Sequence, residues 1–252
     1  MKTEIAKDIK SVLEFYQSLG FDMLPIKIAF SRERLAVGKN KLKADSYPQI
    51  TKITNKEESL KSLREEIGDC KRCRLSEGRK NLVFGEGNHE ARIMFVGEGP
   101  GREEDLQARP FVGDAGMLLT RLIEKMGFKR EDVYIANIVK CRPPMNRDPE
   151  KDEIERCRGF VERQIEIINP EVIISLGRIS AQTLIGNVAL KMTAIRGNFF
   201  DYKGIPLMPT FHPAYLLRNP KDKWLTWSDA QKVLEKLQGS VKQRKGESAK
   251  GI

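Results

Sequence analysis

Three short apolar runs, separated by helical patterns, most strongly limit the folds open to this chain. The runs cover residues 92–96, 133–139 and 172–176, and each is almost continuously apolar. Strands that are buried on both faces of a parallel sheet have this character, whereas strands with one solvated face alternate. The pattern therefore predicts a three-layer α/β/α fold, in which helices cover both faces of a central, mostly parallel sheet.

Helical patterns fill the intervals between these runs. They predict helices at about residues 115–126, 150–168 and 179–185 and a last helix at 228–238, while residues 202–205 form a predicted hairpin turn. In such folds ligands bind at the carboxyl ends of the strands. We expect three regions: an N-terminal extension at 1–64 (a helix, a basic linker and a second helical stretch near 56–67), an α/β domain at 65–238, and a polar, disordered tail at 239–252.

Charge and hydropathy limit the partners. The chain has 252 residues and a formal net charge of +10 at pH 7, which favours a polyanion such as nucleic acid. The alternative is a charged surface that serves only solubility or heat stability. No apolar run reaches membrane-spanning length and no secretory signal is evident, so we expect a cytoplasmic protein without a membrane partner.

The four cysteines have an unusual arrangement. Two residues separate Cys70 from Cys73 and fifteen separate Cys141 from Cys157, and each cysteine has Lys or Arg neighbours. Positive charge stabilises thiolates, which are metal ligands. Four thiolates suit a [4Fe–4S] cluster or a structural zinc ion equally well, and two disulfides are a weaker alternative in a chain without a signal peptide.

Residues with chemical potential follow the predicted strands. A turn with three glycines in five residues (97–101) follows the first strand, and it lacks the Gly-Lys-Ser/Thr of a phosphate-binding loop. Asn137 interrupts the second apolar run, where a buried amide needs hydrogen-bond partners. Phe111 lies on a loop after the glycine turn, and His212, one of two histidines, follows the hairpin. Taken singly, each of these residues also fits a structural role.

Taken in order, these motifs resemble a known family. The segments are Gly-Glu-Gly-Pro-Gly (97–101), Arg-Pro-Phe-Val-Gly (109–113), Asn-Ile-Val-Lys-Cys-Arg-Pro (137–143) and His-Pro-Ala-Tyr-Leu-Leu (212–217). With the cysteine spacing, residues 65–238 resemble the family-4 uracil-DNA glycosylases, the thermostable iron–sulfur branch of their superfamily. The resemblance implies a repair enzyme that flips uracil out of DNA and hydrolyses its N-glycosidic bond. It also implies a [4Fe–4S] cluster on Cys70, Cys73, Cys141 and Cys157.

The resemblance further implies roles for individual residues. Phe111 would stack on the base, Asn137 would read uracil O4 and N3–H, and His212 would donate to O2. Either Glu98 or Glu104 would position the attacking water, and Glu104 is also a hypothesis for the exclusion of thymine. The expected uracil-binding residues are Glu98, Gly99, Pro100, Phe111, Asn137 and His212. The expected DNA-binding residues, in a loop that wedges into the duplex, are Leu216, Leu217 and Arg218.

Two other functions stay open at this point. A relative with relaxed specificity would act on hypoxanthine or other deaminated bases, although such branches usually lack a carboxylate at the Glu98 position. A non-enzymatic iron–sulfur or zinc module would bind DNA lesions without cleaving them. The expected partner is single- or double-stranded DNA, uracil-containing in the preferred interpretation, bound by a monomer in a prokaryotic nucleoid. The sequence does not fix a sliding-clamp contact or the role of residues 1–60.

Overall fold

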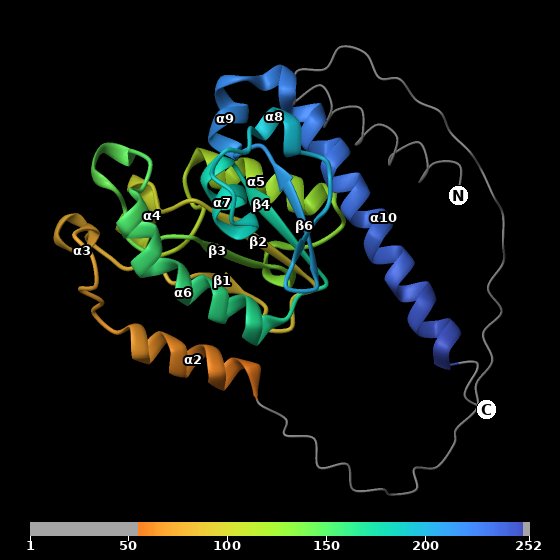
Figure 1. Ribbon diagram of the computed structural model, residues 1–252, viewed down its shortest axis with the longest axis horizontal. Helices are drawn as coiled ribbons and strands as arrows, with labels where there is room; N and C mark the ends of the chain where they lie inside the picture. Colours follow the sequence, from red (N-terminus) through yellow and green to blue (C-terminus); the bar gives the residue numbers. More distant parts are fainter. Residues whose placement is uncertain (1–54, 249–252) are drawn as a thin grey trace, which may run out of the picture. The chain divides into compact units, whose positions relative to one another are not determined.

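The computed structural model describes residues 55–248 (Figure 1). Most of the predicted N-terminal extension therefore lies outside the described residues, and its last helix, α2 (Lys56–Ile67), lies within them. The side chain of Asn55 caps α2 by accepting hydrogen bonds from the backbone N–H groups of Glu57 and Glu58. Gly68 ends the helix with a φ of 48°, a conformation that glycine adopts easily.

A mixed sheet of six strands forms the centre of the fold, in the order β1-β3-β2-β4-β6-β5. The four central strands are parallel, and the short edge strands β1 and β5 pair antiparallel with their neighbours. The three apolar runs form β2, β3 and β4, and the predicted hairpin joins β5 to β6. The strands are β1 (Glu86–Gly87), β2 (Ile93–Gly97), β3 (Tyr134–Asn137), β4 (Val172–Leu176), β5 (Phe200–Tyr202) and β6 (Ile205–Thr210).

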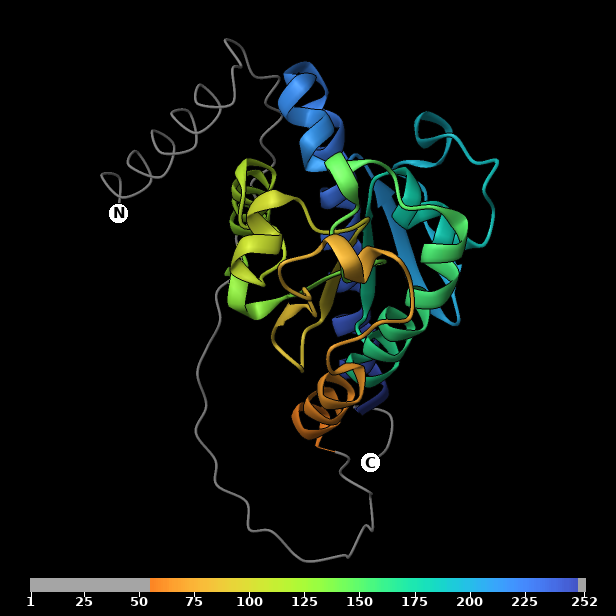
Figure 2. The same ribbon diagram turned by 90° about the vertical axis from the view of Figure 1, so that its left-hand side faces the viewer.

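Helices cover both faces of the sheet, which confirms the predicted three layers (Figures 1 and 2). Alternate residues of one strand face different layers: Met94 belongs to the apolar core under α2, α6 and α7, and Phe95 to the core under α5 and α10. The long helices are α5 (Asp114–Lys125), α6 (Lys151–Ile168), α7 (Arg178–Ile185) and α10 (Lys223–Ser248). Within residues 55–248 no helix combines the length and apolar character needed to cross a membrane.

The structure differs from the prediction in its short elements and in its last helix. Helices of four to six residues are too short to give a periodic pattern, so they were not predicted. Helix α10 continues to Ser248 and thus takes in part of the expected tail, because a glycine such as Gly239 weakens a helix without ending it. The short elements are α3 (Leu75–Gly78), α4 (Arg102–Gln107), α8 (Met192–Ile195), α9 (Pro213–Arg218), η1 (Arg130–Asp132), η2 (Pro144–Asn146) and η3 (Pro220–Asp222).

The four parallel strands all end at one edge of the sheet. β2 ends at Gly97, β3 at Asn137 and β6 at Thr210. The backbone N–H of Gly177, just after β4, donates to the carbonyl of Thr210 at 2.9 Å and ties two of these ends together. Residues far apart in the sequence therefore meet at this edge, as expected for a doubly wound sheet.

Candidate active site

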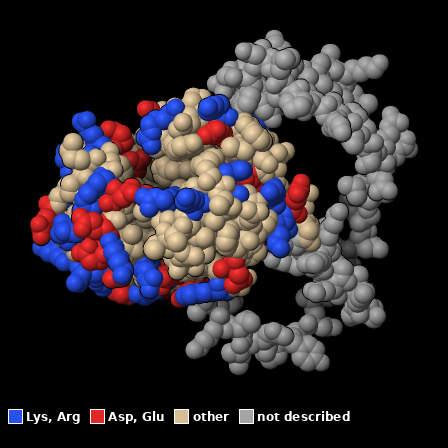
Figure 3. Space-filling model, turned by 45° about the horizontal axis from the view of Figure 1, so that its top comes forward, with Lys and Arg blue, Asp and Glu red and all other residues tan. Residues whose placement is uncertain are grey.

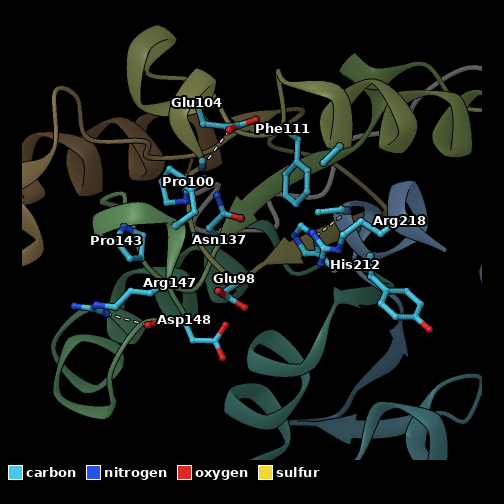
Figure 4. Close-up of a pocket in the computed structure, with 16 residues that line it drawn as sticks. Glu98, Pro100, Glu104, Phe111, Asn137, Pro143, Arg147, Asp148, His212 and Arg218 are labelled. Atoms are coloured by element: carbon cyan, nitrogen blue, oxygen red, sulfur yellow. Dashed lines mark hydrogen bonds between the residues drawn. The ribbon is translucent and has the colours of Figure 1, made fainter.

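A cavity of about 370 Å³ lies at this edge of the sheet (Figure 4). This volume suits a small ligand such as a nucleobase. Loops after β2, β3 and β6 line it, together with the start of α5. The predicted site residues that the structure brings together around it are Glu98, Gly99, Pro100, Glu104, Phe111, Asn137, His212 and Arg218.

Asn137 presents an unsatisfied hydrogen-bond acceptor to the cavity. Its side chain is 1% exposed, and its Oδ1 has no partner among the described residues. Leaving a buried polar atom unpaired costs about 1–3 kcal/mol, so a ligand donor at this atom would relieve a real penalty. The backbone of Asn137 is fixed from behind, because the buried Lys140 Nζ donates to its carbonyl at 2.9 Å and to Gln164 Oε1 at 2.6 Å.

Glycine at position 97 makes this arrangement possible. A Cβ on Gly97 would lie 2.4 Å from Asn137 Oδ1 and 2.6 Å from Phe111 Cζ. Both contacts are too short for any side chain, so the amide and the aromatic ring approach each other across this residue. The glycine turn therefore has a packing role in the site as well as a conformational one.

Glu104 fixes the loop that carries Phe111. Its Oε1 accepts hydrogen bonds from the backbone N–H groups of Val112 at 2.9 Å and Gly113 at 3.0 Å, and its Oε2 accepts one from Gly101 at 3.1 Å. These bonds join the first two motifs and hold Phe111, whose φ of 50° is unusual for a non-glycine residue. Both oxygens of Glu104 are thus already bound to the protein.

His212 has a defined tautomer and charge. Its Nδ1 accepts a hydrogen bond from the backbone N–H of Ala214 at 3.1 Å, which leaves the ring proton on Nε2. Burial, assisted by the nearby Arg218 and opposed by Glu104, lowers the pKa of His212 to about 4. The ring lies 5.6 Å from that of Phe111 between centroids. At neutral pH this residue is an uncharged N–H donor.

Glu98 differs from Glu104 because nearby groups favour its protonated form. Burial raises its pKa to about 7, and the negative charge of Asp148 adds to this effect, while Arg178 opposes it. Figure 4 shows the carboxyl groups of Glu98 and Asp148 on the same side of the cavity, below Asn137. A carboxyl group with a pKa near neutrality is suited to accept a proton.

The loop after β3 contributes residues that sequence reasoning missed. It begins within the recognised motif, at Pro143, but the polar residues that come after the motif have no periodic pattern that marks them. Asn146 adopts a left-handed conformation with φ of 56°, and its Oδ1 accepts a hydrogen bond from Arg142 Nε at 2.7 Å. The residues of this loop that line the cavity are Pro143, Asn146, Arg147 and Asp148.

Helix α9 separates the two leucines expected to contact DNA. Leu216 is 4% exposed and packs with Leu118 and Phe211, whereas Leu217 is 43% exposed. The expectation for Leu216 is therefore wrong, because one face of this short helix turns inward to the core. Leu217 stays accessible, and Arg218 lines the cavity beside it.

The four cysteines are free thiols in one apolar region. Cys141 and Cys157 are buried, and Cys70 and Cys73 pack against the same core cluster. Burial raises the pKa of the Cys73 and Cys141 thiols, and it raises that of Cys157 to about 12. Within residues 55–248, no group of three or more His, Cys, Asp or Glu side chains is arranged to hold a metal ion.

Most of the cations beside the cysteines in sequence bind other groups. Arg72 lies over the ring of Phe160, at 4.5 Å from its centroid, and Arg74 binds Glu153. The sulfur of Cys141 instead accepts a hydrogen bond from Arg79 Nη1 at 3.0 Å, a contact that no sequence pattern indicated. The sulfur of Cys157 accepts one from the backbone N–H of Lys140 at 3.3 Å.

Charged side chains of both signs are mixed on one face of the molecule (Figure 3). Figure 3 shows Lys and Arg interspersed with Asp and Glu on the face that it presents. The net charge of the chain therefore does not gather there into a patch of one sign. Any contact with a polyanion on this face (Figure 3) depends on individual cations.

Comparison with known proteins agrees with the site. Residues 84–238, more than half of the chain, match the model of the uracil DNA glycosylase superfamily. The chain therefore belongs to this superfamily. It is 51% identical over 165 residues to the Type-4 uracil-DNA glycosylase of Thermotoga maritima, which covers 65% of this chain and 86% of the relative.

A second Type-4 relative has a similar identity to the chain, and a Type-5 relative has a much lower one. The Type-4 uracil-DNA glycosylase of Saccharolobus solfataricus is 48% identical over 188 residues, covering 71% of this chain and 87% of the relative. The Type-5 uracil-DNA glycosylase of Pyrobaculum aerophilum is 27% identical over 146 residues, covering 52% of this chain and 64% of the relative. The expected resemblance to the family-4 enzymes is thus confirmed.

Proposed function

We propose that this protein removes uracil from DNA by hydrolysing the N-glycosidic bond and leaving an abasic site. The observation that carries the proposal is the unpaired Oδ1 of Asn137 in a base-sized cavity. This atom accepts the N3–H of uracil, while the Nδ2 group donates to O4. Cytosine presents the reverse order of donor and acceptor, so an amide that keeps this orientation rejects it.

The extruded base is held by stacking and by a neutral donor. Phe111 stacks on the uracil ring, an interaction worth about 1–3 kcal/mol, which offsets part of the cost of extrusion. The Nε2–H of His212 donates to O2, where negative charge collects as the bond breaks. A donor aimed at developing charge acts mainly in the transition state, so it raises the rate more than the affinity.

Glu98 rather than Glu104 positions the attacking water. Both oxygens of Glu104 already accept backbone hydrogen bonds, so we assign it to the positioning of Phe111. As the C1′–N1 bond breaks, its electron pair stays on uracil, and the water oxygen bonds to C1′. Glu98 orients this water and takes its proton, a role that a carboxylate with a pKa near 7 performs well.

Contacts to DNA come from the α9 region. Leu217 is exposed beside the cavity and fills the space that the base leaves in the duplex. Arg218 binds backbone phosphate, which adds salt-dependent affinity without sequence preference. Neither contact depends on whether the opposite base is guanine or adenine.

Cys70, Cys73, Cys141 and Cys157 hold a [4Fe–4S] cluster in this proposal. The donor set fits, since the four free thiols lie in or against one apolar cluster and N–H groups reach the sulfurs of Cys141 and Cys157. The cluster supplies a cross-link between distant segments and takes no part in the hydrolysis. Anaerobically purified protein should contain about four irons and four acid-labile sulfides per chain. Stoichiometric zinc without labile sulfide would contradict this assignment.

The activity is tested with oligonucleotides that contain uracil, hypoxanthine or no lesion, each in single-stranded and duplex form. Incubation is followed by alkali to reveal abasic sites and by mass spectrometry of the released base. Release of uracil alone supports the proposal. Equal release of hypoxanthine indicates a relaxed glycosylase instead, and tight binding without release indicates a module that only recognises lesions.

A further inference from the structure

Two carboxyl groups from different loops face each other in the cavity. Glu98 follows β2 and Asp148 follows the η2 turn after β3, and both line the cavity (Figure 4). Arg178, at the start of α7, donates a short hydrogen bond to Asp148 Oδ2. The other titratable and charged groups that line the cavity, from the neighbouring elements, are Glu104, Arg147, His212, Tyr215 and Arg218.

Asp148 is held in place from two sides. Arg178 binds its carboxylate, and Arg147 Nη1 donates to its backbone carbonyl at 2.9 Å. Arg147 is itself clamped, because its two terminal nitrogens donate to Glu153 at 2.8 and 2.7 Å. An acidic side chain on a loop is ordinarily free to turn away from a like charge, and these contacts oppose that movement.

We propose that the Asp148–Arg178 ion pair is a positioning device for Glu98, in which Asp148 opposes the charge on Glu98 and Arg178 limits that opposition. The kinetic part of this inference rests on the proposed function, but the electrostatic part does not. Since both partners are substantially exposed, at 60% and 49%, solvent and salt weaken the coupling.

The pair adjusts a proton acceptor that burial alone has already made more basic. Burial contributes most to the raised pKa of Glu98, with Asp148 adding to it and Arg178 lowering it. A general base works best when its pKa lies near the operating pH, because it is then both ionised and basic. The negative charge of Asp148 and the positive charge of Arg178 can each be removed separately, and the two variants should shift the pKa of Glu98 in opposite directions.

The test is the pKa of Glu98, measured by NMR on the full-length protein with ¹³C-labelled glutamate side chains, in the absence of DNA. Glu98→Gln identifies the resonance. At about 0.01 M salt, Asp148→Asn should lower this pKa by about half a unit or more, and Arg178→Gln should raise it by a similar amount. Both shifts should shrink at about 1 M salt, where charges are screened within a few ångströms.

Control variants separate this coupling from general surface charge. Lys203→Gln removes one partner of a comparable exposed ion pair with Glu166, and it should leave the titration of Glu98 unchanged. Arg178→Lys keeps the charge and should shift the pKa less than Arg178→Gln does. Shifts of the same sign in Asp148→Asn and Arg178→Gln, or shifts no larger than in Lys203→Gln, would overturn the proposal.

The kinetic consequence is measured separately. If uracil is excised, the pH at which the single-turnover rate reaches half its maximum should move in the same directions as the pKa. The NMR titration needs no activity, so a protein that fails to release uracil would refute the proposed function and leave this inference to be decided by the titration. Opposite pKa shifts without any movement of the pH–rate profile would refute the role of the pair in the reaction.

Discussion

Two glutamates near the loop that follows β3, Glu153 and Glu98, have surroundings that differ completely. Glu153, at the start of α6, has no exposed side-chain surface and accepts hydrogen bonds from Arg74, Arg147 and the backbone of Glu150. Its pKa falls to about 2, chiefly through Arg147. Glu98 is half-buried in the cavity wall, where no described residue gives its side chain a comparable hydrogen bond, and its pKa rises to about 7.

The contrast separates residues that hold the fold from residues that the fold holds for chemistry. A carboxylate with several charge-assisted hydrogen bonds is stable and unreactive, because its charge is already compensated. A desolvated carboxyl group without such bonds has a raised pKa, and its ionised form destabilises the fold, so contacts elsewhere must offset that loss of stability. Glu104 resembles Glu153, because both of its oxygens already accept hydrogen bonds from the protein. Asn137 resembles Glu98, because its Oδ1 has no partner among the described residues.

Glu98→Gln is expected to have the largest effect. The single-turnover rate of uracil release should fall by about three orders of magnitude, since the proton acceptor is lost.

The stability of Glu98→Gln should change in the opposite direction to its rate. With a raised folded-state pKa, the ionised carboxylate opposes folding above about pH 7, and this penalty vanishes below the ordinary pKa of 4.5. The melting temperature should therefore rise at pH 8 and stay nearly unchanged at pH 4. A variant that is inactive and destabilised at pH 8 would break the comparison.

Glu153→Gln should reverse that pattern. Breaking its contacts with Arg74 and Arg147 should lower the free energy of unfolding by about 3 kcal/mol in chemical denaturation. The wild-type contribution is fully present above the ordinary pKa of 4.5 and is lost as the pH falls towards 2, because the folded-state pKa is depressed. The rate per folded molecule should stay within a few-fold of wild type. A rate loss that matches Glu98→Gln would show that the two glutamates do not divide the roles.

His212→Ala extends the comparison to a neutral group. The rate should fall by about two orders of magnitude with little change in the affinity for uracil-containing DNA, because uracil O2 becomes strongly basic only as the bond breaks. His89→Ala, at the only other histidine of the chain, is the matched control and should behave as wild type. Equal losses of rate and affinity would indicate a ground-state contact instead.

The two leucines of α9 should give the smallest effects, and they sharpen the distinction at the surface. Leu217→Ala should lower the rate several-fold on duplex DNA and hardly at all on single strands, which need no extrusion. Its melting temperature should match wild type. Leu216→Ala should instead lower the free energy of unfolding by about 3 kcal/mol and affect both substrates alike. Identical behaviour of the two variants would remove Leu217 as a duplex contact.

The sequence predicted the central sheet well because its strands are buried on both faces. Val172–Leu176 was found with its observed limits, since every residue of β4 is buried and apolar character marks both ends. The short helices α4 and α9 gave no such signal. In α9 the consequence was an error, because the sequence Leu216-Leu217 does not reveal which side chain faces the core.

The candidate site was predictable where a residue contradicted its surroundings. Asn137 stood out as an amide in an apolar run, and His212 as a rare residue after a strand. The choice between Glu98 and Glu104 needed the three-dimensional structure, since the hydrogen bonds of Glu104 and the raised pKa of Glu98 distinguish these two nearby acidic residues. Asp148 and Arg147 lie in a polar loop without a pattern, and their approach to the cavity depends on contacts with Arg178 and Glu153.

The pH dependence of uracil excision tests the central claim most directly. Under single-turnover conditions with enzyme below saturation, the rate constant reports the ionisation of the free enzyme. It should rise about tenfold per pH unit and level off near pH 7, where Glu98 is ionised, with His212 neutral throughout because its pKa is about 4. Glu98→Gln should abolish this break. No release of uracil, or a wild-type rate that is flat between about pH 5 and 8, would contradict the account.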